Sequence, residues 1–401
     1  MAFYGVGGTG LIQSKSMRLP RGVPRRGILH RLALVALACL WLWDRAPAEQ
    51  KNKKKEQETQ TLQALPELPG TISGPTHRLT FHVTPLSPKG LLSAQIREAL
   101  RTLFRECAGE RVLQIRAFVA GSGDIRRVRD LVSEVFTERH QPLPVLCLVR
   151  AGGLPMEGAQ VVLEAIAAGR KEVNAHGLAF FSATVETSES PFDSVVPLSE
   201  KSLAALGRAV KAAGVEAGDV VRVTCFLSSL ENLAATRGMV EAEYHKAALD
   251  YVQTAREPLH ALAACEAVGR LGADPAAPLE LRNPEGAASE TGRSAIALVN
   301  TAEVVLTGSQ VSFGYQEQDA RLAFERLGKE LEQAGTASSR VAFAHYYPLS
   351  QSIAEQIRKT RAGTFDGQHP PAGTMLVFEG LSSMDAGFAV DAIAVKSKAV
   401  Q

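Results

Sequence analysis

The feature of this sequence that most constrains its fold is an internal repeat. One order of segments occurs three times: an amphipathic helix, a glycine, a run of β-branched and aromatic residues, a second helix and two further apolar runs. The glycines are Gly109, Gly214 and Gly335, which lie 105 and 121 residues apart and suit the left-handed conformation that often ends a helix. Such a repeat predicts three similar units in one chain.

The segments of each copy predict an α+β unit with the order strand-strand-helix-strand-helix-strand-strand. The first helices are expected at 96–107, 203–213 and 322–334, the middle strands at 112–119, 220–227 and 341–347, and the second helices near 125–135, 233–244 and 352–361. The closing strand pairs are expected at 144–149 with 159–167, 261–268 with 278–282, and 374–380 with 387–395. Opening strands are expected near 79–83, where the run is truncated, and at 177–185 and 303–311. In such a unit two helices cover one face of a mixed sheet.

The first 48 residues have the composition of a secretory signal peptide. Residues 1–31 carry Lys15 and five arginines but no acidic residue, an apolar run follows at 32–43, and small residues stand at Ala46 and Ala48. The alternative is an inner-membrane anchor formed by residues 28–43, but this run is short of the ~20 apolar residues that a membrane span needs. We therefore expect an exported, periplasmic or extracellular protein that contacts a membrane only through its N-terminal segment.

A charged linker is expected at 49–76, in front of the three units. Its first part, 49–60, contains no apolar residue and therefore cannot bury surface to offset the entropy of ordering. The units are then expected at 77–168, which is truncated, at 169–283 and at 284–401.

Composition and motifs argue against several classes of function. A formal net charge of +2 and an aromatic content of 6% do not favour a nucleic-acid partner. The sequence has no HxH or HExxH spacing and no phosphate-binding glycine motif, so neither a metal site nor a cofactor is expected. Export permits disulfides, whereas buried free thiols are the default interpretation of the four cysteines after the signal segment. These are Cys107, Cys147, Cys225 and Cys265.

Four segments resemble the RidA/YjgF family of enamine and imine deaminases: 212–244, 306–311, 370–395 and 153–167. The resemblance covers most of residues 90–401 and is strongest in the second and third copies. It implies a chorismate-mutase-like fold and ligand clefts between neighbouring units, because members of the family are generally homotrimers. Three copies in one chain would then form a monomeric pseudo-trimer by intramolecular threefold assembly.

The resemblance also implies where the family's catalytic groups would stand. A strand arginine of the family grips the substrate carboxylate, and a carboxylate on the last strand handles the attacking water. The arginine positions correspond to Leu146, Ala263 and Gly373, none of which is arginine. The acid positions correspond to Glu164 and Asp391, our candidate catalytic residues, whereas Arg282 stands there in the second copy.

Further residues are candidates for ligand binding. Ser182 and Thr184 in the second copy, and Gly308 and Gln310 in the third, match a cleft segment of the family, and Cys265 matches a small cleft residue. Gly373 and Arg282 are further candidates, and Arg256 and His260 precede a strand of the second copy and could reach a cleft. Structural alternatives remain open: a buried core thiol for Cys265, a solvent-facing strand end for Arg282 and pleat-compatible surface for the hydroxyl residues.

The expected function is therefore that of an exported, RidA-like protein that binds a small molecule and lacks the usual catalytic arginine. The alternatives are an active enamine/imine deaminase that uses relocated residues and a scaffold that binds protein partners. A cleft into which polar groups converge would favour either of the small-molecule functions, and an apolar, filled cleft would favour the scaffold.

Overall fold

The computed structural model of the chain describes residues 64–283, 295–366 and 369–396. The expected signal peptide and most of the charged linker lie outside the described residues. Residues 63–401 group into one compact unit, which contains six α-helices and three β-sheets in its described parts. None of the described helices has the length and apolar content needed to cross a membrane.

The first sheet is built from consecutive strands whose spatial order differs from their order in the chain. β2 (Leu79–Val83), β3 (Arg111–Val119), β4 (Val145–Arg150) and β5 (Val161–Ala168) are arranged β4-β3-β5-β2. β3 is parallel to β4 and antiparallel to β5. Helices α1 (Leu92–Glu106) and α2 (Arg126–Glu138) bury their apolar faces against this sheet, in a cluster that includes Ile96, Val132 and Ile115.

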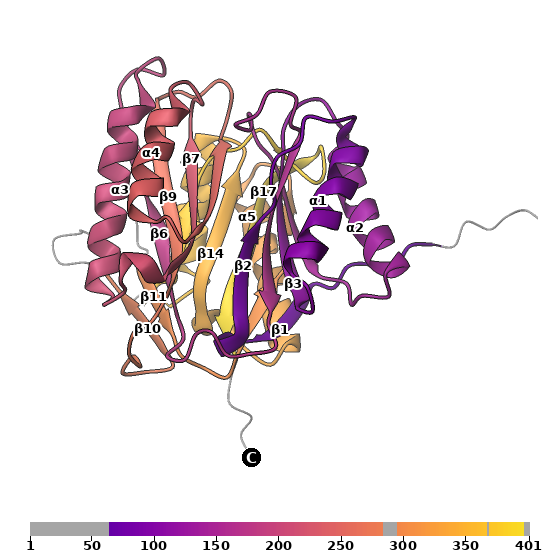
Figure 1. The fold of residues 1–401 in the computed structure, drawn as a ribbon, viewed down its shortest axis with the longest axis vertical. Coiled ribbons are helices and arrows are strands. Elements are labelled where there is room, and N and C mark those ends of the chain that lie inside the picture. The colour runs from indigo at the N-terminus through magenta and orange to yellow at the C-terminus, as the bar shows by residue number, and fades with distance from the viewer. Residues whose placement is uncertain (1–63, 284–294, 367–368, 397–401) are drawn as a thin grey trace, which may run out of the picture. The chain divides into compact units, whose positions relative to one another are not determined.

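The second sheet has the same core order, β8-β7-β9-β6. Its strands are β6 (Leu178–Thr187), β7 (Val220–Leu227), β8 (Ala248–Gln253) and β9 (Leu262–Arg270), and β11 (Ile296–Val299) and β10 (Leu279–Arg282) extend it beyond β6. Helices α3 (Val195–Ala212) and α4 (Leu233–Glu243) cover one face, where Leu206 and Val240 join a cluster with Val223 of β7. In Figure 1 the pairs α1–α2 and α3–α4 flank the strands on opposite sides.

The third sheet repeats this order as β15-β14-β17-β12. Its strands are β12 (Glu303–Thr307), β14 (Val341–Pro348), β15 (Ala372–Met375) and β17 (Ala386–Val395), and β13 (Gln310–Phe313) also pairs with β17. Helices α5 (Glu317–Gln333) and α6 (Gln351–Ala362) cover one face, where Phe324 and Ile357 are buried with Ala344. Short 3-10 helices are η1 (Thr76–Arg78), η2 (Ala217–Asp219) and η3 (Ser338–Arg340).

Edge strands are exchanged between the sheets. β1 (Thr71–Pro75), within the expected linker, pairs with β12 of the third sheet. β11 follows the expected boundary at residue 284 but pairs with β6 of the second sheet, and β16 (Gly380–Leu381) pairs with β4 of the first. Strand exchange therefore joins the three sheets to one another, and it crosses the boundary expected at residue 284.

The faces of the sheets that point away from the helices meet in a shared interior. Phe81, Phe180 and Phe343, one from each sheet, belong to one apolar cluster. A second cluster contains Phe118, Phe226 and Tyr347 from the three middle strands. On each closing strand one acid lies between a residue of the second cluster and a residue of the first, so a polar layer separates the two apolar clusters. The three strand triplets are Val162-Glu164-Ile166, Ala264-Glu266-Val268 and Ala389-Asp391-Ile393.

The main difference from the sequence-based expectation is in the second unit. β8 was not predicted, the run 261–268 is the closing strand β9 instead of its partner, and 279–282 pairs with β11. β8 has only six residues and includes Asp250 and Gln253, so neither apolar alternation nor a continuous apolar run marks it. Helices α1, α3 and α5 also begin four or more residues earlier than expected. Ser194 caps α3, and a capping box of Gln316 and Asp319 begins α5.

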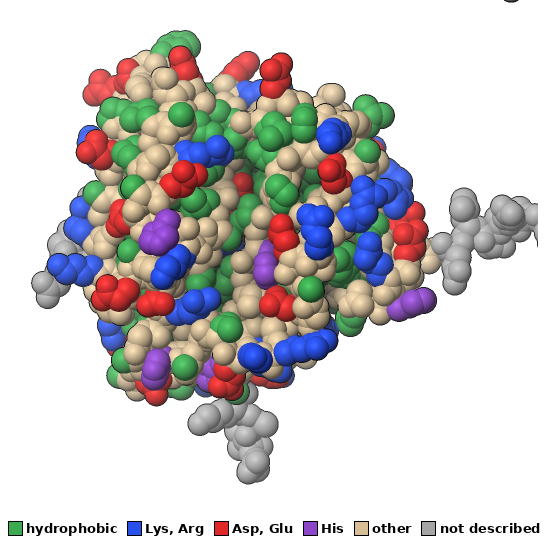
Figure 2. Space-filling view, viewed as in Figure 1, with side chains coloured by type: hydrophobic (Ala, Val, Ile, Leu, Met, Phe, Trp, Pro, Cys, Tyr) green, Lys and Arg blue, Asp and Glu red, His purple; other side chains and the backbone are tan. Residues whose placement is uncertain are grey.

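The cysteines differ from their default interpretation in one pair. Cys225 of β7 and Cys265 of β9 stand directly opposite each other and form a disulfide, whereas Cys107 and Cys147 are free and buried. The interpretation of the cysteines as buried free thiols is therefore right for Cys107 and Cys147 and wrong for Cys225 and Cys265. On the face shown in Figure 2, acidic and basic side chains are interspersed, so no single sign of charge dominates that face.

Candidate functional site

Ionisable side chains gather in the polar layer where the three sheets meet. Each middle strand contributes one residue that is directly paired with an acid on the neighbouring closing strand. The three pairs are Arg116 with Glu164, Thr224 with Glu266, and His345 with Asp391. All six residues are buried, so each charge depends on its partners for stabilisation.

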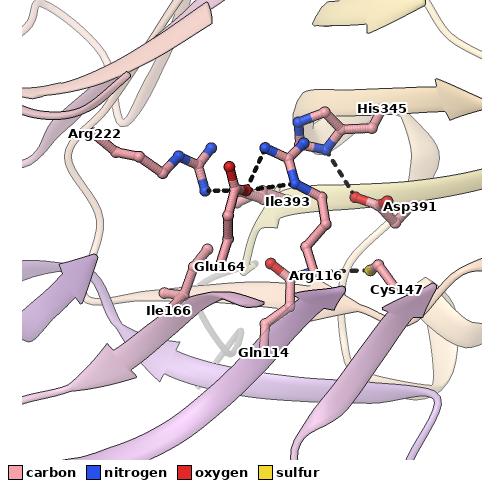
Figure 3. A pocket seen from close by; sticks show the side chains of 9 residues that line it. All are labelled: Gln114, Arg116, Cys147, Glu164, Ile166, Arg222, His345, Asp391 and Ile393. Carbon is pink, nitrogen blue, oxygen red and sulfur yellow. Dashed lines mark hydrogen bonds and ion pairs between the residues drawn. The ribbon is translucent and has the colours of Figure 1, made fainter. Parts of the chain in front are cut away.

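Arg116 connects the first sheet to the second. Its Nε donates a hydrogen bond to Glu164 Oε2 at 2.6 Å, and its Nη2 donates to Glu266 Oε1 at 2.7 Å (Figure 3 shows its contact with Glu164). Thr224 donates its hydroxyl to the other oxygen of Glu164 at 2.5 Å. Arg222 lies 3.7 Å from Glu164 and 3.6 Å from Glu266, so two guanidinium groups face these two acids.

His345 connects the second sheet to the third. Its Nε2 lies 3.1 Å from Glu266 Oε1, and its Nδ1 lies 2.9 Å from Asp391 Oδ1. Both nitrogens can donate to these oxygens only when the imidazole is protonated. Burial and the charge of Arg116 oppose protonation, but Glu266 and Asp391 outweigh them, and the pKa of His345 is raised.

The acidic groups of the layer differ in their protonation. Burial raises the pKa of a carboxyl group, but neighbouring cations together more than offset burial at both glutamates, and the pKa of each is lowered. Arg116 and Arg222 act on Glu164, and Arg116, His345 and Arg222 act on Glu266. Asp250 on β8 behaves in the opposite way, because burial and the neighbouring Glu164 raise its pKa well above the usual range. Two guanidinium groups and an imidazolium therefore face three paired acids, with Asp250 held neutral.

The polar layer is closed. The space inside it is about 10 Å³ and is lined by the ionisable residues together with Gln114, Cys147, Ile166 and Ile393 (Figure 3). That is about the size of one water molecule and too small for an organic substrate. Glu164 and Asp391, the candidate catalytic acids, are thus brought together in an ion-pair network and not at an open site.

An open cleft of about 1220 Å³ lies between the second and third sheets. The second sheet contributes β6 and the segment between β8 and β9, and the third contributes one face of α6 and the segment after β15. Four of the residues singled out in the sequence line this cleft: Ser182, Thr184, Arg256 and His260. The structure therefore brings together candidates that lie more than seventy residues apart in the chain.

The cleft combines charged and apolar surfaces. The backbone N–H of Arg256 donates to Glu379 Oε1 at 2.5 Å, and its Nε lies 3.6 Å from the other oxygen of Glu379, which joins the two sides of the cleft. Leu376 and Phe378 supply apolar surface. Arg361 is only 5% exposed and lies over the Tyr346 ring at 5.6 Å, and burial lowers its pKa.

The cationic residues of α6 were missed by the sequence analysis. Gln351, Ala354, Arg358 and Arg361 all line the cleft. They recur every three or four residues and so share one face of the helix. That spacing was a readable signal, but nothing in it indicates that this face meets the second sheet.

The other candidate binding residues do not line the cleft. Cys265 is in the disulfide, and Arg282 on β10 pairs with Glu280 at 2.8 Å. The strand pairing places Glu266, not Arg282, at the position equivalent to Glu164 and Asp391. Gly308 donates its N–H to Gly70 at 2.8 Å, and Gln310 begins β13.

The strand pairing also revises the position corresponding to the family's arginine in the second copy. Leu146 pairs with Ile115 and Gly373 pairs with Ala344, each one residue before the central layer. The equivalent residue of β8 is Leu249, which pairs with Val223, whereas Ala263 lies on the closing strand. A Cβ atom at Gly373 would lie 2.4 Å from the Ala344 oxygen, so no side chain fits there.

Comparison with known proteins gives matches among solved structures. No protein-family model and no curated protein matches the chain. Similar structures include a member of the YjgF/YER057c/UK114 family from Mycobacterium tuberculosis, with 19% identity, a TM-score of 0.22, and coverage of 29% of this chain and 98% of that one. A Rid family protein from Yersinia pestis has 18% identity, a TM-score of 0.27, and coverage of 30% and 99%. A YjgF family member from Neisseria meningitidis has 13% identity, a TM-score of 0.23, and coverage of 30% and 97%. Each of these proteins aligns almost whole with less than a third of this chain.

Proposed function

We propose that this protein is an exported, single-chain pseudo-trimer of RidA-like units that binds a small molecule in the cleft between its second and third units. The observation that carries the proposal is the cleft itself, which is large enough for a metabolite and combines apolar surface with converging polar groups. Because the cleft is open and polar, small-molecule binding explains it better than a protein-binding scaffold does.

The pseudo-trimer is supported by the repeated strand order and by equivalent contacts between units. Ala183, at the opening strand of the second unit, donates its N–H to Thr374 Oγ1 of β15 at 3.1 Å. Ser309, at the corresponding place in the third unit, donates its N–H to the Leu146 oxygen of β4 at 3.3 Å. Two opening strands thus meet the parallel strand of the next unit in a similar way, and this supports the cyclic arrangement that a trimer requires.

The residues at the expected catalytic positions argue against ordinary deaminase activity. The positions that the resemblance assigns to the catalytic arginine, Leu146, Ala263 and Gly373, supply no guanidinium, and neither does Leu249, which the strand pairing makes equivalent to Leu146. Loss of one oriented group of this kind commonly costs ~10²–10³ in rate. Glu164 and Asp391 are held by Arg116 and His345 and do not line the cleft.

A second candidate function is supported by one specific observation. Arg358, Arg361 and Glu379 line the same cleft, so a relocated cation and a relocated carboxylate are both present. Such a pair could hold a substrate carboxylate and orient a water, which is the chemistry of an enamine/imine deaminase. A rate measurement separates this candidate from simple binding.

Export is proposed from the basic, apolar and small-residue segments of the N-terminus, with an inner-membrane anchor at 28–43 as the alternative. The Cys225–Cys265 disulfide supports export, because disulfides persist in oxidising compartments. Fractionation of cells that express the full chain would test this, and recovery of the protein with the reduced cytosolic proteins would contradict it.

The first experiment generates 2-aminoacrylate with a coupled enzyme in the presence of the full chain and follows the release of pyruvate. We expect release no faster than the uncatalysed background. Acceleration that is lost in Glu379→Gln would instead establish the deaminase candidate.

Binding is tested by a metabolite screen that measures the shift in Tm. We expect a ligand that raises the Tm of the wild type and raises it much less in Arg358→Ala. Lys359→Ala is the matched control, because Lys359 is the next residue of α6 but does not line the cleft. Equal shifts in both variants would place the ligand elsewhere and contradict the proposal.

A further inference from the structure

Three side chains with metal-binding atoms meet at the edge of the first unit, away from both the cleft and the buried layer. His82 lies on β2, Cys107 caps the end of α1, and Glu110 directly precedes β3. The imidazole nitrogen, the sulfur and a carboxylate oxygen of these residues all lie within 4.8 Å of one another.

The turn between α1 and β3 brings two of these ligands together. Gly109 has a φ of 84°, a left-handed conformation that favours glycine, and the N–H of Glu110 donates to the Cys107 carbonyl at 2.8 Å. Arg170 holds the same turn from outside by donating to the Gly109 carbonyl at 3.2 Å. Cys107 and Glu110 are therefore fixed on one side of a short, braced turn.

β2 supplies the third ligand and a supporting hydroxyl. His82 Nε2 lies 3.0 Å from Glu110 Oε2, and Thr80, two residues earlier on the same face of the strand, donates its hydroxyl to that oxygen at 2.6 Å. A hydrogen bond from a neighbouring side chain to a ligating carboxylate orients it, as is usual around metal sites. The carboxylate is thus positioned before any ion binds.

Access and chemistry both suit a metal ion. The side chains of His82 and Glu110 are 19% and 22% exposed, whereas Cys107 is buried behind them, so an ion could enter from solvent and reach the sulfur. One sulfur, one imidazole nitrogen and one carboxylate oxygen are ligands that Zn²⁺ accepts, and three protein ligands leave a fourth position open. Ligand atoms of a tetrahedral zinc site lie about 3.5 Å apart, so the side chains need to move by about 1 Å to close around the ion.

We infer that His82, Cys107 and Glu110 form a binding site for Zn²⁺ with one open coordination position. The inference is independent of the proposed function, because none of these residues lines the cleft. Motif searching could not find the site, because His82 and Cys107 lie 25 residues apart on different elements. The alternative is that His82 and Glu110 serve only as hydrogen-bond partners of each other and of Thr80, and the experiment must distinguish this from metal binding.

The test uses Co²⁺ as a spectroscopic probe for zinc. The protein is the full chain with its disulfide intact and with Cys39→Ser, which removes the thiol of the N-terminal segment as a competing ligand. We expect one Co²⁺ per chain, a thiolate-to-cobalt charge-transfer band in the near ultraviolet, and displacement of the band by Zn²⁺. Cys107→Ser should abolish the band, whereas Cys147→Ser, the matched control at the other free buried thiol, should retain it. Absence of the band in the wild type, or its persistence in Cys107→Ser, would overturn the inference.

Cys107→Ser could lose the band through misfolding. Variants that retain Cys107 but change the other proposed ligands are therefore also tested. His82→Gln and Glu110→Gln should each weaken Co²⁺ binding by at least about tenfold, and Thr80→Val should weaken it by about tenfold through loss of the supporting hydrogen bond. Circular dichroism would establish that these variants are folded. Unchanged affinity in both His82→Gln and Glu110→Gln would show that the sulfur binds cobalt without this site and would also overturn the inference.

Discussion

At the scale of single residues, Arg116 is central to the buried polar layer. It is itself buried, and its charge compensates the charges of two acids from different sheets. Its replacement by methionine keeps much of the side-chain volume but leaves Glu164 and Glu266 buried with less compensation. Removal of one partner from a buried ion pair typically costs about 3–5 kcal/mol. We therefore expect Arg116→Met to lower the free energy of unfolding by that amount, measured by urea denaturation.

The control is an ion pair at the surface. Arg97 and Glu134 join α1 to α2 at 2.7 Å, but both side chains are about one-third exposed. Exposed pairs contribute at most about 1 kcal/mol, so Arg97→Met should have a small effect. Equal losses in the two variants would show that the buried network has no special contribution.

Gly373 is a position where the backbone of the neighbouring strand leaves no room for a side chain. An added Cβ would lie 2.4 Å from the backbone oxygen of Ala344, and backbone cannot move aside cheaply. Gly373→Ala should therefore destabilise the protein by about 1–3 kcal/mol. Gly238 in α4 has open space around it, and Gly238→Ala should stabilise by up to about 1 kcal/mol. If thermal denaturation shows Gly373→Ala to be neutral, this position could accept a side chain after all.

Among the elements, sequence patterns located those with strong periodicity and missed those without it. The face of α2 that carries Val128, Val132 and Val135 was readable, and these residues are buried as expected. β8 was missed because its pairing with β7 makes it a strand, and its own composition does not indicate one. It lies at the edge of the described sheet and carries a buried acid, Asp250. The strand order of each sheet likewise depends on pairings between residues far apart in the chain.

The disulfide links two elements, β7 and β9, of the second sheet. It closes a loop of 40 residues that contains α4 and β8. A cross-link of this length restricts the unfolded chain and stabilises by about 3–4 kcal/mol in the chain-entropy model. The double variant Cys225→Ala, Cys265→Ala should show a loss of this size in urea denaturation. A loss no larger than that of Cys147→Ala would mean that the effect is only one of packing.

For the molecule as a whole, the sequence indicated three units but not how their side chains meet. Glu164 and Asp391 stand at corresponding positions of two closing strands. Their burial between apolar layers could not be predicted, because it depends on how the sheets face one another. The cleft is a similar case. Arg256 and His260 were proposed from the sequence of the second copy, but the residues of α6 that line the same cleft come almost a hundred residues later.

The buried layer also predicts how stability depends on pH, because His345 ties Glu266 of the second sheet to Asp391 of the third. The pKa of His345 is raised, so its contribution is fully present below the unfolded value of about 6.5 and is lost as pH rises through the higher folded value. The pKa of Glu266 is lowered, so its contribution is present above about 4.3 and is lost as pH falls through the lower folded value.

Stability should therefore be greatest in mildly acidic solution and decline on the alkaline side as His345 loses its proton. Urea denaturation of the wild type between about pH 5 and pH 9 should show this decline, and His345→Gln should be less stable at pH 5 and show a smaller decline, because an amide does not titrate. Asp250, whose folded pKa is also raised, contributes to the decline equally in both proteins. His369→Gln is the matched control, because His369 is exposed and lies 3.3 Å from Asp366, in an environment unlike that of the buried layer. Since His345 spans two sheets, the wild type should also unfold in one transition at acidic pH, with all three sheets lost together. An alkaline decline of equal size in wild type and His345→Gln would mean that another group controls it and that the imidazolium bridge does not hold the sheets together.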